Sequence, residues 1–231
     1  MITLRKANER GHAQHGWLTS WHSFSFADYH NPAHMHFRSL RVINEDIIAP
    51  AEGFGTHPHR DMEIITYVLS GALAHKDSMG NGASILPGEV QAMSAGSGIT
   101  HSEFNALSDA PTHLLQIWIL PHTKNVTPSY DEWKPDGSQQ KDWVCVASDG
   151  GREGGVAIHQ DARLYLTHAQ AGESREVKVP AGRYGYLHVA KGAVECAGHK
   201  LVAGDAMMFG AGDVSSLSVS AAGEFLLFDL S

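Results

Sequence analysis

The apolar residues of this chain fall in short runs that predict β-strands rather than helices. Glycine, proline, asparagine and aspartate separate the runs, and turn-forming sequences occur at 78–82, 87–89 and 203–205. Many short strands at this spacing favour an all-β sandwich or barrel over βαβ units. We find no helical periodicity longer than two or three turns. The strand-like runs are 40–43, 64–69, 113–120, 143–146, 186–189, 206–209 and 225–228.

Residues 121–141 have the character of a linker. They contain Pro121, Pro128 and Pro135 among polar residues, and they show no apolar periodicity. A chain of 231 residues has room for two domains, each large enough to bury a core of its own. We therefore predict an N-terminal domain at 1–130 and a C-terminal domain at 131–231.

Two pairs of polar residues in the first half suggest a metal site. His57 and His59 are two residues apart, as are His101 and Glu103. On an extended chain such residues project from the same face of a sheet. Two pairs on neighbouring strands can converge on one ion, and neutral imidazoles with one carboxylate suit a divalent first-row metal. Four protein ligands leave one or two positions open on a five- or six-coordinate iron, which is what chemistry at the metal needs.

A weak internal repeat suggests that the second half has the same fold without this site. Residues 67–73 resemble 188–194, and both stretches are followed by a glycine and an acidic residue. None of the four residues His57, His59, His101 and Glu103 is retained in the second half of the repeat. Their counterparts there are Lys178, Pro180, Leu217 and Val219. We therefore expect a metal-free C-terminal domain.

Composition excludes several partners. Lys and Arg number 17 and Asp and Glu 25, giving a formal charge of −8 with no basic run, so we expect no direct nucleic-acid binding. Cys145 and Cys196 do not make a disulfide framework. No apolar run approaches the roughly 20 residues of a membrane span, and the first ten residues have no secretion signal. We therefore expect a cytoplasmic protein that does not bind membranes.

The motifs resemble those of the cupin superfamily, and within it the pirin family. A His-x-His sequence on one strand and a Gly-x-x-His-x-x-x-Asn sequence on another are typical of cupins. The resemblance to pirins is dense over the first 120 residues and thin afterwards. Two positions depart from the general cupin pattern, which has glycine at Ala51 and proline at Gly96. The segments that carry the pirin resemblance are 16–26, 53–71, 77–81 and 93–103.

The resemblance implies both the fold and the ligands. It predicts an all-β bicupin, with two β-barrel (jelly-roll-like) domains in one chain. It implies His57, His59, His101 and Glu103 as metal ligands, with Glu103 also in a catalytic role. Cupins at large often use the carboxylate at Glu63 instead, which we expect to lie beside the site or at the edge of the core. We read the histidines of the aromatic-rich segment after Trp17 as packing and surface residues, with a place at the pocket mouth as the alternative.

The resemblance also implies an activity, with two alternatives. Pirins with quercetinase activity imply a dioxygenase that holds one divalent transition metal, Fe(II) in the first instance. Mn, Co, Ni, Cu or Zn would suit the same ligands. The substrates would be O2 and a small aromatic flavonol such as quercetin. The first alternative is a redox-sensing regulatory protein that binds a protein partner, which the negative charge permits. The second is a different cupin reaction on another small molecule.

Overall fold

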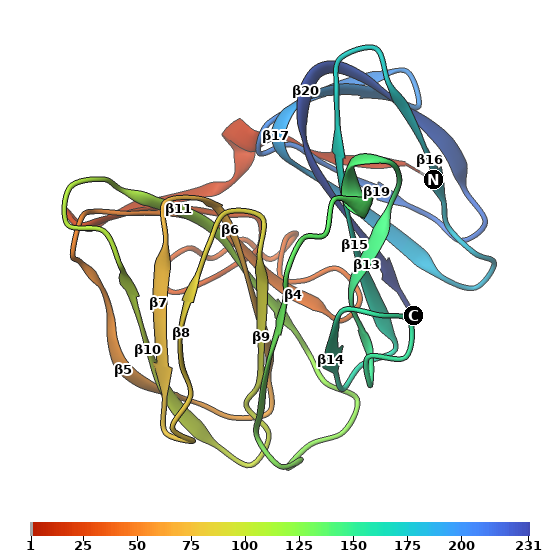
Figure 1. Ribbon diagram of the computed structural model, residues 1–231. Coiled ribbons are helices and arrows are strands. Elements are labelled where there is room, and N and C mark those ends of the chain that lie inside the picture. The colour runs from red at the N-terminus through yellow and green to blue at the C-terminus, as the bar shows by residue number, and fades with distance from the viewer. Residues whose placement is uncertain (1) are drawn as a thin grey trace. The chain divides into compact units, whose positions relative to one another are not determined.

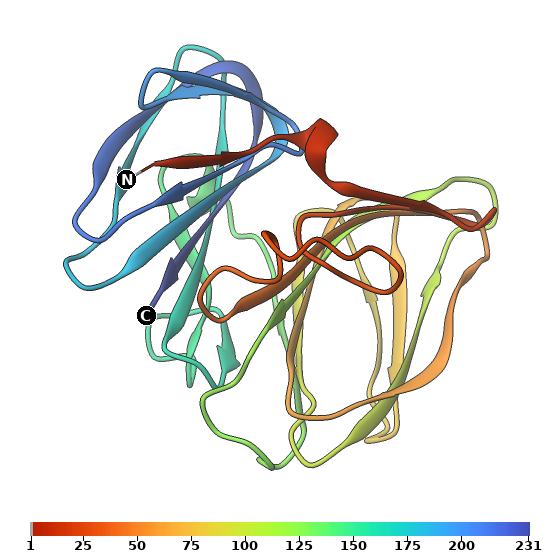
Figure 2. The same ribbon diagram turned by 180° about the vertical axis from the view of Figure 1, so that it is seen from behind.

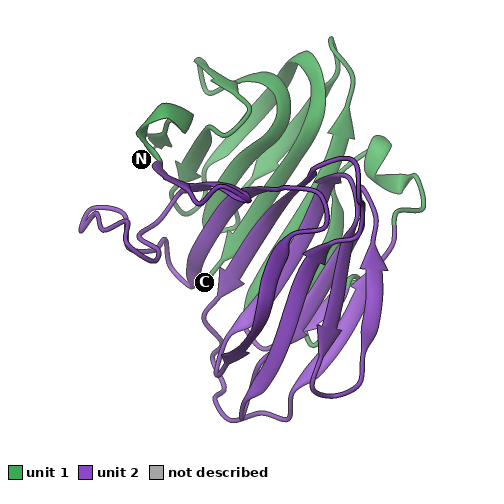
Figure 3. Cartoon of the chain, turned by 90° about the vertical axis from the view of Figure 1, so that its left-hand side faces the viewer, with its two compact units in different colours: residues 1–10, 135–155, 161–231 green, residues 11–134, 156–160 purple. Residues whose placement is uncertain are grey.

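The computed structural model describes residues 2–231 and confirms an all-β fold. Two 3₁₀ helices, η1 (Ala7–Glu9) and η2 (Ser138–Gln140), are the helical elements of the described chain. Neither they nor any other described segment forms a helix long and apolar enough to span a membrane. The chain folds into two compact units, coloured separately in Figure 3. Unit 1 comprises 1–10, 135–155 and 161–231, and unit 2 comprises 11–134 and 156–160.

Unit 2 contains two antiparallel sheets that stand face to face (Figure 1). The larger sheet has the order β12-β9-β6-β11-β4-β3-β2, and the smaller has the order β5-β10-β7-β8. The larger sheet consists of β2 (Gly11–Gln14), β3 (Leu18–His22), β4 (Leu40–Ile48), β6 (Glu63–Ser70), β9 (Val90–Ser94), β11 (Thr112–Ile119) and β12 (Ser129–Trp133). The smaller consists of β5 (Gly53–His59), β7 (Leu73–Asp77), β8 (Gly82–Ile85) and β10 (Ile99–Asn105). Strand β14 (Val156–Ile158) also falls in this unit.

Unit 1 is built on one sheet with the order β1-β19-β17-β20-β15-β13, to which β16 and β18 add at β20 and β17. The strands are β1 (Thr3–Arg5), β13 (Val144–Asp149), β15 (Ala162–Ala169), β16 (Ser174–Lys178), β17 (Tyr184–Cys196), β18 (His199–Val202), β19 (Ala206–Phe209) and β20 (Val214–Leu230). The long strands β17 and β20 bend, so one sheet encloses its own core. The sheets of both units are open, and in this respect the fold is jelly-roll-like rather than a pair of closed barrels.

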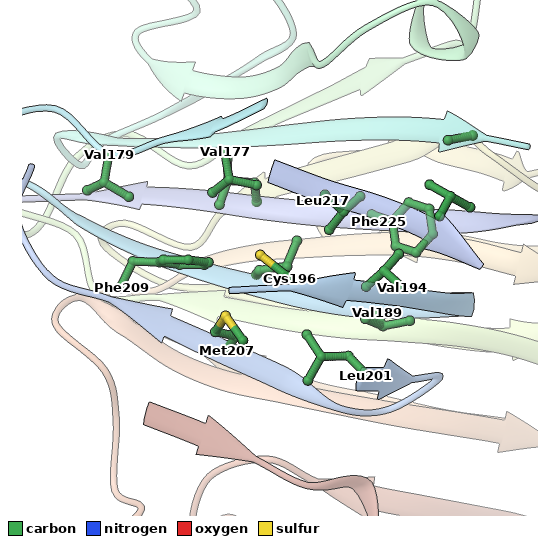
Figure 4. Close-up of a cluster of buried hydrophobic side chains, with 14 residues drawn as sticks. Val177, Val179, Val189, Val194, Cys196, Leu201, Met207, Phe209, Leu217 and Phe225 are labelled. Atoms are coloured by element: carbon green, nitrogen blue, oxygen red, sulfur yellow. The ribbon is translucent and has the colours of Figure 1, made fainter. Parts of the chain in front are cut away.

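The core of unit 1 includes two of the four positions that correspond to the metal-site motif in the repeat, whereas the other two, Lys178 and Pro180, are exposed. Leu217 and Val219, the counterparts of His101 and Glu103, are buried among Val177, Phe209 and Phe225 (Figure 4). Both groups of potential metal-ligating side chains found among residues 2–231 lie in unit 2. Aliphatic side chains thus stand where His101 and Glu103 stand in the other unit.

One part of the expected linker is a strand. Residues 129–133, within the predicted linker 121–141, form β12 and pair with β9 along its full length. Alternation of apolar residues did not reveal this strand because it lies at a sheet edge, where all five of its residues keep some solvent contact. The predicted domain ranges 1–130 and 131–231 stay a prediction.

We expect the turn between β6 and β7 to be far less tolerant than the turn between β7 and β8. Gly71 and Gly80 both have positive φ, +83° and +95°. A Cβ on Gly71 would lie 2.7 Å from the Thr112 Cα, whereas one on Gly80 would meet nothing within 4 Å. Gly71→Ala should lower the free energy of unfolding by about 3 kcal/mol or more, and Gly80→Ala by about 1 kcal/mol. Equal losses in urea denaturation would contradict this packing.

Candidate metal centre

Pairing of β5 with β10 brings three histidines together. His57 lies directly opposite His101 in the antiparallel register, and His59 follows two residues along the same strand. The ring centroids are 4.8 Å apart for His57 and His59, 4.5 Å for His57 and His101, and 4.9 Å for His59 and His101. One nitrogen from each ring lies within 4.8 Å of the other two. The structure therefore gathers the three histidines that the sequence predicted as ligands.

Hydrogen bonding orients the ring of His57 toward the other histidines. Its Nδ1 lies 2.8 Å from the carbonyl oxygen of Gly55, which can only accept, so Nδ1 carries the proton and donates. The lone pair then belongs to Nε2, which faces Nε2 of His101 at 3.1 Å. Fixing the tautomer of a ligand through its other nitrogen is a common device of metal sites.

Burial keeps His59 and His101 neutral. Burial, and then the charge of His57, lowers the pKa of His59 to about 4. Burial, followed by the neighbouring histidines, lowers the pKa of His101 to about 3. Neutral imidazoles near pH 7 have lone pairs available for a cation. Three such nitrogens converging at one point fit a divalent transition metal.

Glu103 is buried, as is His101 on the same strand, whereas His57 and His59 are partly exposed. The Glu103 carboxylate accepts hydrogen bonds from Gln116 Nε2 at 2.8 Å and from Thr66 Oγ1 at 3.2 Å. A bulge after His101 shifts the β10 register relative to β5. Glu103 consequently groups within 4.8 Å with His101 and His75, not with His57 and His59. Its place as the fourth ligand stays a prediction.

Glu103 and Glu63, the carboxylate that cupins at large often use as a ligand, have different surroundings. Burial raises the pKa of Glu103 to about 7, against the hydrogen bonds from Gln116 and Thr66. Glu63 is also buried, but its carboxylate contacts the Ser94 hydroxyl and lies 3.5 Å from His159 Nδ1. Glu63 therefore belongs to a separate polar cluster, at the edge of the core.

The histidines open onto a cavity of about 870 Å³. His57, His59, His101 and Glu103 all line it. Its described lining combines aromatic side chains with the carboxylic acids Asp28, Asp46 and Glu103 and contains no lysine or arginine, so it disfavours anionic ligands. Such a volume lies in the range of small-molecule sites. The aromatic side chains in its walls are Trp17, Phe26, Tyr29, Phe54 and Trp118.

The irregular segment between β3 and β4, orange-red in Figure 2, supplies part of this wall. It contributes Phe26 and Tyr29, and His22 at the end of β3 also lines the cavity. His22 stacks near both rings, with centroids 5.4 Å from Phe26 and 6.3 Å from Tyr29. Phe26 and Tyr29 of this segment, together with His22 of β3, thus line the cavity, and the place of the segment at the pocket mouth stays a prediction.

A row of polar side chains crosses the inner face of the larger sheet. Adjacent strands place five buried residues side by side, namely His22, Asn44, Gln116, Thr66 and Gln91. Glu103 reaches this row from the opposite sheet through Gln116 and Thr66. The carboxylate is therefore held by the sheet that faces its own strand.

Comparison with known proteins identifies the family. The family model described as Pirin matches residues 3–119, and the model of the quercetinase C-terminal cupin domain matches 145–230. The chain belongs to the pirin family. A quercetin 2,3-dioxygenase of Escherichia coli K12 is 47% identical over 230 residues, covering 100% of this chain and 99% of that protein. A putative quercetin 2,3-dioxygenase of Pseudomonas aeruginosa is 44% identical over 211 residues, 90% of each chain.

Solved structures agree with the pirin assignment. The crystal structure of the bacterial pirin YhhW in complex with nickel(II), from Escherichia coli, superposes with a TM-score of 0.94 at 46% identity. That match covers 100% of this chain and 99% of the other. The predicted membership of the pirin family, and with it the cupin fold, is confirmed.

Sequence reasoning did not find the polar groups that surround the candidate ligands in this pirin. Thr66 and Gln116 stand within apolar runs, and Asp46 follows one. These residues become neighbours only through the register in which β6, β11 and β4 pair, which the sequence does not show. The one hint in the sequence is a polar residue at a strand position that would otherwise be apolar and buried.

We predict that Asp46→Asn stabilises the metal-free pirin, and more so at higher pH. Burial raises the pKa of Asp46 from 3.8 to about 7, the Ser20 hydrogen bond acting against it. The folded state thus holds a proton that the unfolded state releases above pH 3.8, so wild-type stability falls as pH rises through this window. Asparagine does not titrate, and its advantage should grow by about 2–3 kcal/mol between pH 5 and pH 8. Urea denaturation at the two pH values measures it; a constant difference would refute the buried-carboxylate assignment.

Proposed function

We propose that the chain is a metal-dependent dioxygenase that opens the ring of a flavonol such as quercetin with O2, with Fe(II) as its metal. The observation that carries the proposal is the opening of the three histidines onto the 870 Å³ cavity with aromatic walls. A closed structural site would bury its ligands away from any ligand-sized space. An open one leaves room for a flat aromatic substrate beside the metal.

The relatives support this reading. Proteins that match the whole chain carry the name quercetin 2,3-dioxygenase, and a pirin of the same fold binds nickel(II). A divalent ion held by His57, His59 and His101, with Glu103 as the fourth ligand, is consistent with both. Fe(II) remains our proposal, because Mn, Co, Ni, Cu and Zn suit the same donors.

A bound divalent ion would lower the pKa of a substrate hydroxyl placed beside it. Glu103 is the group that would accept the released proton, when its carboxylate shifts from the metal to the substrate. Gln116 and Thr66 hold its two oxygens and so fix the carboxylate at the floor of the cavity. Trp118, whose ring centroid is 5.1 Å from that of His59, forms an apolar wall next to the histidines and limits access of water.

The alternatives make different predictions for the same protein. A redox-sensing regulator with a protein partner would bind metal without flavonol turnover, and a different cupin reaction would need another substrate. The proposal includes the cytoplasmic location and the lack of direct nucleic-acid binding expected from the sequence.

His101→Ala should abolish both metal binding and flavonol turnover. The substitution removes the nitrogen that faces His57 at 3.1 Å and leaves two histidines of one strand. Metal content after dialysis should fall below about a tenth of an ion per chain, because loss of a ligand costs more than the 10–100-fold expected for an outer neighbour. The exposed His122 gives a matched control, and His122→Ala should keep both properties. Turnover retained by the His101 variant would refute the proposal.

Glu103→Gln should lower the rate of turnover even when the metal site is saturated. At saturating metal, kcat should fall at least a hundredfold, since the proton acceptor is lost, while the Kd for the flavonol changes little. Glu63→Gln is the matched control, because Glu63 is an equally buried carboxylate that contacts Ser94 and His159 instead. A full loss of kcat in the Glu63 variant and none in the Glu103 variant would reverse the assignment of the carboxylates.

A further inference from the structure

Strand β7, the neighbour of β10 on the side away from β5, carries a buried histidine that the proposed site does not use (Figure 1). His75 lies opposite Glu103 in the β7–β10 register, and its exposed fraction is 3%. Its ring centroid is 5.2 Å from that of His101 and 5.1 Å from that of Tyr130. One ring nitrogen each of His75 and His101 and one carboxylate oxygen of Glu103 lie within 4.8 Å of one another. His75 therefore packs against a candidate metal ligand in the interior of the unit.

Three ring nitrogens at this contact are buried and have no hydrogen-bond partner among the described residues. They are Nδ1 of His101 and both nitrogens of His75. His57 differs, because its Nδ1 donates to the carbonyl oxygen of Gly55. Histidine ligands of metal sites almost always donate their second ring N–H to an acceptor, which holds the ring in its orientation. Within residues 2–231, His101 has no such acceptor already hydrogen bonded to it.

The contact between His57 and His101 decides where the proton of His101 lies. Because Nε2 of His57 is an acceptor, Nε2 of His101 is the donor across their 3.1 Å contact. A neutral imidazole has one N–H, so Nδ1 of His101 then carries a lone pair. When Nε2 instead binds a cation, the proton of neutral His101 lies on Nδ1. Cation binding thus turns a buried acceptor into a buried donor, which needs an acceptor beside it.

Asp77 favours the tautomer of His75 in which Nδ1 is that acceptor. It lies two residues further along β7, and its Oδ2 is 3.7 Å from Nε2 of His75. N–H groups of Met79 and Asn81 hold the carboxylate at 2.9, 3.0 and 2.8 Å. A carboxylate beside Nε2 favours a proton on that nitrogen and leaves the lone pair on Nδ1. Burial lowers the pKa of His75, with Asp77 acting against it, so the ring is neutral near pH 7.

Glu103 is the other acceptor close to His101, but its oxygens already accept hydrogen bonds. Gln116 and Thr66 donate to them, and the carboxylate is itself a predicted metal ligand. His75 has no competing hydrogen bond among the described residues. It is therefore the better acceptor for a proton on Nδ1 of His101.

We propose that His75 is a positioning residue of the metal site, which accepts a hydrogen bond, directly or through one water molecule, from Nδ1–H of metal-bound His101. His75 thereby keeps Nε2 of His101 aimed at the metal and makes that ring a stronger electron donor. Asp77 keeps His75 in the accepting tautomer. The inference rests on the proposed metal site and not on the reaction with a flavonol. A purely structural His75 would contribute only ring packing.

Two replacements of His75 that branch in the same way test this role. His75→Leu removes the acceptor, whereas His75→Asn keeps an acceptor oxygen close to the position of Nδ1. The affinity of the full chain for Ni(II) is measured by competition with a chelator. The Kd should rise about 10–100-fold in His75→Leu, as expected for loss of an outer partner of a ligand, and His75→Asn should bring it back to within about threefold of wild type.

The midpoint potential of bound iron is the second measurement, because it reports how strongly His101 donates electrons. A more electron-rich imidazole stabilises Fe(III) relative to Fe(II). His75→Leu should therefore weaken Fe(III) binding about tenfold more than Fe(II) binding, which raises the one-electron potential by about 59 mV. His75→Asn should reverse most of this rise.

His113→Leu is the matched control. His113 is a half-buried histidine of the same unit, outside the described lining of the cavity, and its Nε2 lies 2.9 Å from Oε1 of Glu45. The Ni(II) affinity and the iron potential of this variant should equal those of wild type. If His75→Leu fails to fold, His75→Phe replaces it, because phenylalanine keeps a ring beside Tyr130 but has no acceptor.

The outcomes separate this role from the proposed reaction. A wild-type Kd and potential in His75→Leu overturn the role of His75. Equal losses in His75→Leu and His75→Asn overturn it too, because ring packing would then explain them. A Kd that depends on His75, without flavonol turnover by the wild type, leaves the role standing and refutes the reaction. Turnover by the wild type with a Kd independent of His75 does the reverse.

Discussion

The register of one antiparallel strand pair is the constraint on which the site depends. Pairing of β5 with β10 sets His57 opposite His101, and the alternation of β5 adds His59 to the same face. A slip of one residue would turn these side chains to the other face of the sheet. The Gly55 carbonyl then selects the tautomer of His57, and burial keeps His59 and His101 neutral. The geometry of the candidate metal site is thus set largely by the backbone.

The larger sheet of unit 2 places buried polar side chains at positions where a protein core is normally apolar. The row from His22 to Gln91 is buried, and desolvation raises the pKa values of both Glu103 and Asp46 to about 7. Such groups cost stability, so their presence beside a cavity favours a functional explanation over a structural one. Unit 1 shows the contrast, since Leu217 (Figure 4) and Val219, the counterparts of His101 and Glu103, are buried in an apolar cluster.

Much of this organisation was readable in the sequence. Strands β4, β6 and β11 follow from their apolar runs, and the two-residue spacing of His57 and His59 predicts their common face. Strand β12 was not found, because an edge strand with partly exposed residues has no apolar alternation. The polar row was not found either, since its five members come from five strands and become neighbours only through register. Sequence motifs report residues close along the chain, whereas the surroundings of the ligands are assembled across strands.

The most direct test of this account is oxygen uptake by protein loaded anaerobically with Fe(II) and given quercetin. The same protein stripped of metal is the control. We predict metal-dependent uptake together with loss of the flavonol absorbance. No uptake from protein shown to hold one iron ion per chain would contradict the account, and would favour either a redox-sensing protein or a substrate that quercetin does not mimic.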